Sequence, residues 1–145
     1  MNAHALPEPT AIDPDKLKLF SFHLFGKLEG AVTAGMIHLG DQLGLYSALR
    51  GATAGLGSVE LADRTGLAER WVREWAYNQA AAGLVEATTA PDGLVTFALT
   101  PEAAAVLATP EHPAYGMGMF HRLPQTMRAL EDMPASFRSG VGHDY

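Results

Sequence analysis

The sequence has 145 residues, of which 48% are hydrophobic and 18% are charged, and it carries a net charge of −6 with a pI near 5.4. This length suits one domain with a buried core, and the acidic balance argues against a general affinity for nucleic acid or anionic membranes. The absence of cysteine excludes disulfides and thiolate metal sites.

Residues 1–12 contain two prolines and no apolar periodicity, which predicts a flexible arm. The chain start has neither the basic residues nor the apolar run of a signal peptide. The longest uncharged stretch that follows, residues 30–40, is too short to cross a bilayer. We therefore expect a cytoplasmic protein.

Helical patterns cover residues 13–50. The first helix is predicted to begin at Asp13 and Pro14, because aspartate caps a helix and proline is favoured in its first turn. A helix that is apolar on two faces is either enclosed in a core or shared with a second chain. We favour sharing, and therefore predict a homodimer built on these helices. The two apolar faces are Leu17, Phe20, Leu24 and Leu28 on one side and Leu19, Phe22 and Phe25 on the other, and the interface candidates are Leu19, Phe20, Phe22 and Phe25.

The second part of this stretch, residues 30–49, uses smaller side chains. Glycine inside a helix costs about 1 kcal/mol relative to alanine. The repeated use of Gly26, Gly30 and Gly35 therefore indicates close helix packing or a bend between two helices. The predicted apolar stripe consists of Val32, Met36, Leu39, Leu43 and Tyr46.

Residues 58–100 have the pattern of a winged helix-turn-helix. Ser58 as N-cap and Gly66 as a left-handed stop bound the first predicted helix. The second runs from about Glu69 to Ala82, before Gly83. Its predicted buried face consists of Val72, Trp75, Ala76, Gln79 and Ala80.

A hairpin is predicted to follow these helices. Two short strands, residues 84–86 and 95–99, flank a polar tip at residues 88–93. The predicted fold is therefore mainly α, a winged helix-turn-helix with a two-stranded β-wing, preceded by N-terminal dimerisation helices. We assign the winged helix to about residues 51–109.

The excess of negative over positive side chains in the predicted winged helix argues against binding to DNA. Affinity for duplex DNA rests on Lys and Arg at phosphates, so we do not expect nucleic acid as the partner. A stand-alone transcription regulator remains the alternative, with Arg70 and Arg73 contacting bases and a dimer partner supplying further phosphate contacts. The positive residues are Arg64, Arg70 and Arg73, against Glu60, Asp63, Glu69, Glu74, Glu86 and Asp92.

After the wing, Thr100 is predicted to cap a short helix over residues 103–108. We expect a lid or linker helix within residues 110–133, interrupted at Pro124, and a linker over residues 134–145.

Within this region, residues 115–122 combine aromatic and methionine side chains with flexible glycines, which suits the wall of a ligand pocket. An apolar or aromatic small molecule is the predicted ligand. The alternative is that the apolar side chains only close the core. The candidates for lining a substrate pocket are Met117, Met119, Phe120, His121 and Arg122.

Other motifs have ordinary explanations. The three Gly-x-Gly motifs, at residues 55–57, 116–118 and 140–142, do not stand between the strand and helix of a βαβ unit, so no nucleotide site is predicted. The histidines show no spacing typical of a metal site, and none is predicted. Trp71 and Trp75 are expected to pack on neighbouring helices. We assign no catalytic residue.

Five segments form one continuous pattern: Gly40 to Leu49, Glu60 to Gly66, Arg70 to Trp75, Ala80 to Glu86 and Phe97 to Glu102. This pattern resembles the N-terminal winged-helix domain of bacterial class I S-adenosylmethionine-dependent methyltransferases. More distantly, it resembles the dimerisation domain of small-molecule O-methyltransferases. The resemblance implies a dimer built on the N-terminal helices, with the winged helix as a scaffold and partial lid over a substrate pocket.

The same resemblance implies that S-adenosylmethionine is bound by a Rossmann-like domain beyond residue 145. No residue of this sequence is therefore expected to bind the cofactor. We predict a non-catalytic dimerisation and substrate-pocket domain of a small-molecule methyltransferase, which is part of an enzyme only together with that second domain.

Overall fold

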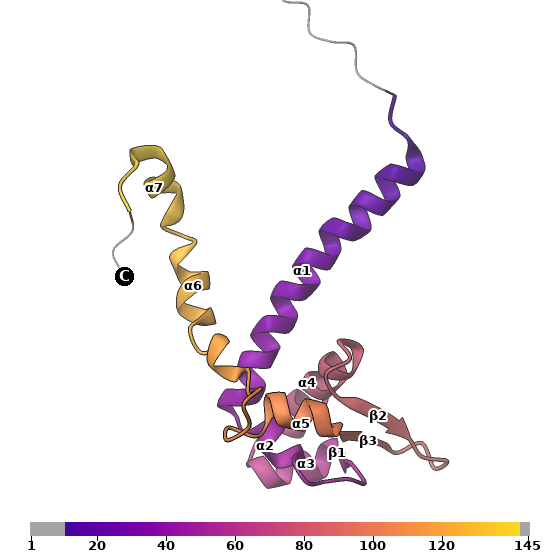
Figure 1. Ribbon diagram of the computed structural model, residues 1–145. Helices are drawn as coiled ribbons and strands as arrows, with labels where there is room; N and C mark the ends of the chain where they lie inside the picture. The colour runs from indigo at the N-terminus through magenta and orange to yellow at the C-terminus, as the bar shows by residue number, and fades with distance from the viewer. Residues whose placement is uncertain (1–10, 143–145) are drawn as a thin grey trace, which may run out of the picture. The chain divides into compact units, whose positions relative to one another are not determined.

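The structure, a computed structural model, describes residues 11–142. The predicted arm lies outside the described residues except for its last two. The chain divides into two compact units, one ending at Ala31 and one beginning at Val32. The elements are α1 (Pro14–Gln42), α2 (Leu45–Leu49), β1 (Leu56–Gly57), α3 (Ser58–Thr65), α4 (Glu69–Ala81), β2 (Glu86–Thr89), β3 (Val95–Ala98), α5 (Pro101–Leu107), the 3-10 turn η1 (Met117–Met119), α6 (Leu123–Ala129) and α7 (Met133–Ser139) (Figure 1).

Helix α1 is continuous over 29 residues. Asp13 caps it as predicted, because its Oδ1 accepts hydrogen bonds from the backbone N–H groups of Asp15 and Lys16 at 2.9 and 3.2 Å. The predicted alternative of a bend is wrong, since Gly26 and Gly30 both lie inside this helix. The helix is followed by Gly44 in a left-handed conformation, with φ of 70°.

The helix-turn-helix pair α3 and α4 is confirmed. Gly66 adopts the predicted left-handed conformation, with φ of 69°, between the two helices. Ser58 was expected to cap α3, but Gly57 occupies the cap position. The Ser58 hydroxyl instead donates to Glu69 Oε1 at 2.6 Å, so it joins the start of α3 to the start of α4.

The wing is confirmed and contains one strand more than predicted. Strand β3 lies between β1 and β2, and both pairings are antiparallel (Figure 1). Leu56 pairs with Phe97, which brings the loop before α3 into the sheet. Strand β2 begins later than predicted, because the amides of Leu84 and Val85 still bond to the Gln79 carbonyl at 2.9 and 3.3 Å.

The core of the second unit forms around the end of α1, α2 and α4. The predicted inner face of α4 is confirmed, with Val72, Trp75, Ala76 and Gln79 all buried. The rings of Tyr46 and Trp75 meet edge to face at 5.1 Å between centroids. The Trp75 indole N–H donates to the Met36 carbonyl at 2.9 Å, so α4 is fixed to the last turns of α1. The buried apolar residues of this core are Ile37, Leu45, Tyr46, Leu49, Leu56, Leu61, Ala62, Val72, Trp75, Ala76, Val85, Phe97, Leu107, Ala108 and Met117.

The chain after the wing is less regular than one interrupted helix. Thr100 caps α5 as predicted, accepting from the Ala103 N–H at 3.1 Å. Proline stands in the first turn of both α6 and α7, so Pro124 opens a helix instead of interrupting one. Helix α7 occupies the start of the predicted linker and ends at Ser139, with Gly140 as its C-cap. Among the described residues, no helix is both long enough and apolar enough to cross a membrane.

Candidate functional site

Helix α1 carries an exposed apolar surface in the first unit. Seven large apolar side chains on both faces of α1 are 53–69% exposed. The predicted interface candidates are among them, and none of the residues 11–142 buries them. They are Leu17, Leu19, Phe20, Phe22, Leu24, Phe25 and Leu28.

The second unit carries an apolar cavity of about 520 Å³. Trp71 lies at its edge and is 70% exposed, with the guanidinium of Arg70 5.8 Å from the ring centroid. The expectation that Trp71 packs on a neighbouring helix is therefore wrong, whereas Trp75 is buried. The cavity can accept apolar groups, and Glu74 is its one charged lining residue. It is lined by Met36, Leu39, Leu43, Leu45, Leu67, Ala68, Trp71, Val72, Glu74 and Trp75.

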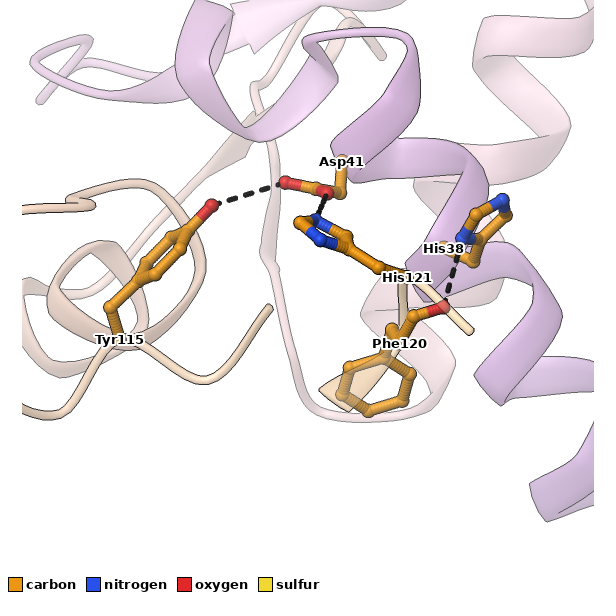
Figure 2. A network of polar contacts seen from close by, with 5 residues as sticks. All are labelled: His38, Asp41, Tyr115, Phe120 and His121. Atoms are coloured by element: carbon orange, nitrogen blue, oxygen red, sulfur yellow. Dashed lines mark hydrogen bonds and ion pairs between the residues drawn. The ribbon is translucent and has the colours of Figure 1, made fainter. Parts of the chain in front are cut away.

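A polar cluster lies at the last turn of α1 (Figure 2). One carboxylate oxygen of Asp41 accepts from the Tyr115 hydroxyl at 3.3 Å, and the other bonds to His121 Nε2 at 2.9 Å. One turn earlier, His38 Nδ1 donates to the Phe120 carbonyl at 3.0 Å. Burial, and then the negative charge of Asp41, raise the pKa of the Tyr115 phenol.

The five predicted substrate-lining residues do not share one environment. Met117 is completely buried in the core, which is the alternative weighed for the apolar members of this group. Met119 is 79% exposed. Phe120 packs against the core, while His121 and Arg122 are exposed. That any of them contacts a small molecule remains a prediction.

The two arginines proposed as alternative DNA contacts are exposed near the start of α4, and Arg73 is already engaged. Its guanidinium lies 3.4 Å from the Glu69 carboxylate. Arg64 is likewise paired with Glu60 at 2.7 Å. These intrahelical pairs lower the positive charge that the helix-turn-helix can offer to phosphates.

The Gly-x-Gly motif at residues 55–57 does not lie in a βαβ unit. Gly55 precedes the two-residue strand β1 and Gly57 ends it, and β1 pairs antiparallel to β3. A Cβ atom at Gly55 would lie 3.0 Å from the Thr96 side chain, so this glycine serves close packing of the sheet. Within residues 11–142, no three His, Asp or Glu side chains are placed to hold one metal ion.

Sequence reasoning missed the role of Asp41. This residue was part of the pattern Gly40 to Leu49, but no local feature shows that its partners lie 74 and 80 residues away. The helical pattern was predicted to continue to residue 49, so the sequence did not show that Asp41 lies in the last turn of a helix.

Comparison with sequence families gives a match over residues 31–109 to the family described as Rv2258c-like winged HTH domain. This is more than half of the chain. The chain belongs to the Rv2258c-like winged helix-turn-helix family. No curated protein sequence matches it significantly.

Solved structures share the fold of this family member. Human N-acetylserotonin methyltransferase, in complex with SAM, matches with a TM-score of 0.71 at 15% identity, over 93% of this chain and 37% of that one. The mitomycin 7-O-methyltransferase MmcR matches with a TM-score of 0.70 at 24% identity, over 90% of this chain and 37% of that one. PigF with SAH matches with a TM-score of 0.64 at 16% identity, over 88% and 34%. The chain thus spans little more than a third of the length of these proteins, and the likeness establishes the fold.

Proposed function

We propose that this winged-helix chain is the dimerisation and scaffold module of a small-molecule S-adenosylmethionine-dependent methyltransferase. Two of the solved structures that share its fold are named as methyltransferases, and the third is described with SAH. In this proposal the methyl donor binds to a separate Rossmann-like domain, and the module acts in the cytoplasm. The module contributes the dimer contact and part of the substrate environment.

The observation that carries the proposal is the uncovered apolar surface of α1. If each of its seven exposed side chains presents on the order of 100 Å² of apolar surface, together they present about 700 Å². The largest apolar patch on a typical monomer is about 300–600 Å², whereas a stable interface buries about 800 Å² per partner. A second copy of the chain that packs against both faces of α1 would therefore bury an apolar area close to that of a stable interface.

The role in the substrate environment rests on the segment after α5. The His121 ring is exposed, and the hydrogen bond between its Nε2 and the Asp41 carboxylate fixes its orientation. We propose that the side chains of His121 and Arg122 face a polar group of the substrate, and that Phe120 faces an apolar or aromatic part. Met117 fixes this segment from inside the core.

Sedimentation velocity tests the dimer. The wild-type chain is expected to sediment as a dimer at about 10 μM, and the double variant Phe22→Glu/Phe25→Glu as a folded monomer, because charges on the apolar face oppose its burial. The control is Phe137→Glu in α7, a surface aromatic that is 87% exposed, which should leave the dimer intact. A wild-type monomer at this concentration, or a dimer that survives the double substitution, would contradict the proposal.

A further inference from the structure

The segment between α5 and α6 is fixed to the rest of the second unit at several points. We call residues 108–121 the strap. At its start, Arg50 Nη1 donates to the carbonyl of Ala108 at 3.0 Å. In its middle, the Gly116 N–H donates to the Val106 carbonyl at 3.0 Å, and the Met117 side chain is buried.

The end of the strap is fixed by Asp41. Figure 2 shows the Asp41 carboxylate between Tyr115 and His121, which lie on either side of η1. Both carboxylate oxygens are used, and the Asp41 side chain is only 16% exposed. The neighbouring bond from His38 to the Phe120 carbonyl holds the backbone between these two side chains.

The position of Asp41 is otherwise unfavourable. It lies in the last turn of α1, which has no basic residue to balance it, and a negative charge there opposes the helix dipole. A carboxylate at this place is therefore explained by its bonds to the strap and not by helix stability.

The strap is also the last firmly packed part of the chain before α6. Within the described residues, neither α6 nor α7 contains a buried side chain. The Thr126 hydroxyl bonds locally, to the Arg122 carbonyl at 3.0 Å. The point at which α6 begins is therefore determined by how the strap is held.

We propose that Asp41 is a positioning residue that fastens the strap through Tyr115 and His121 and thereby fixes the origin of α6. This inference does not depend on the proposed function, since it concerns the second unit of the single chain. The competing explanation is that Met117 and the other hydrogen bonds hold the strap and that the bonds to Asp41 add nothing, as is common for exposed ion pairs.

Amide hydrogen exchange of the full chain separates these explanations. In the variant Asp41→Ala, the Gly116 and Phe120 amides should exchange about ten-fold faster or more, which is the effect of losing a hydrogen bond to a charged group. The Leu67 amide, in the turn between α3 and α4, should keep its wild-type rate. The matched control Asp63→Ala removes an exposed helical aspartate and should change none of these rates.

Two outcomes would overturn the proposal. Wild-type exchange of the strap amides in Asp41→Ala would show that Met117 and the other hydrogen bonds suffice. An equal acceleration of the Leu67 amide would show that Asp41 only supports global stability.

A second variant tests the mechanism without altering α1. His121→Gln should reproduce part of the acceleration, and the double variant Asp41→Ala/His121→Gln should exchange no faster than Asp41→Ala alone, because the two residues act through one bond. In the wild-type protein, ring nitrogen NMR should find a proton on His121 Nε2. Additive effects, or a wild-type ring with its proton on Nδ1 alone, would refute the role of His121.

Discussion

The ring of Trp75 lies 2.6 Å from the position that a Cβ atom would occupy at Gly40. The Tyr46 ring lies 2.7 Å from the same position. Gly40 is therefore the point at which α1 and α4 approach so closely that no side chain fits between them.

Gly40→Ala should destabilise the chain by about 1–3 kcal/mol, because the added methyl group forces two buried aromatic rings to move. The control is Gly35→Ala in the same helix, where the added Cβ meets nothing within 4 Å. This control should be neutral or stabilising by up to about 1 kcal/mol, since alanine is the better helix former. Urea unfolding measures both, and equal effects at the two positions would contradict the packing argument.

Gln79 is the one buried polar side chain among the described residues, and it accepts the hydrogen bond of the Tyr46 hydroxyl. Gln79→Leu should cost about 1–3 kcal/mol, because the Tyr46 hydroxyl is left buried without an acceptor. The double variant Tyr46→Phe/Gln79→Leu should cost less than the sum of the two single variants. Additive unfolding free energies would show that the bond does not contribute.

Stability should fall at alkaline pH. Burial, and then the charge of Asp41, raise the pKa of Tyr46 above its ordinary value of about 10. The stabilisation from neutral Tyr46 is therefore complete below pH 10, and it is lost as the pH rises above 10 because the unfolded chain releases this proton first. The loss is up to about 1.4 kcal/mol per pH unit for each such group.

The control for this prediction is Tyr46→Phe. Its unfolding free energy should decline less steeply than that of the wild type between pH 10 and 11, measured by urea unfolding at each pH. If the unfolding free energies of the two proteins declined equally, the loss of stability at alkaline pH would be due to groups other than Tyr46.

Gly55 has a φ of 75°, and an added Cβ would lie 3.0 Å from Thr96. Gly93, at the wing tip, has a φ of 84° but open space around the same position. Gly93→Ala should cost about 1–2 kcal/mol from backbone strain alone. Gly55→Ala should cost more, because the clash with β3 is added. Thermal unfolding compares the stabilities of the two variants. An equal loss of stability would mean that β1 can shift away from β3 without cost.

Binding to DNA should be absent even at low salt. Two of the three arginines of the helix-turn-helix are paired with carboxylates, and the wing tip carries Asp92. Any duplex binder retains a non-specific electrostatic affinity that grows as salt is lowered. A gel shift with random duplex tests this, with Glu69→Gln, which releases Arg73, as a comparison. A salt-dependent gel shift of the wild-type chain would favour the alternative that the protein is a DNA-binding transcription regulator.

The local elements of the chain could be predicted from its amino-acid sequence. The cap at Asp13, the left-handed stop at Gly66 and the inner face of α4 depend on residues within a few positions of one another. For the same reason the sequence showed that α1 is apolar on two faces. Helix capping and helical periodicity are short-range properties, so a single sequence contains them.

Features that depend on residues far apart in the chain could not be predicted in this way. The two-residue strand β1 is too short to show a period of two, and it is a strand only because Phe97 lies beside Leu56. Met117 and Met119 are alike in sequence context, yet one is buried and the other exposed. Asp41 meets His121 across 80 residues of chain. Such contacts form only when the folded chain brings the partners together, so no local pattern contains them.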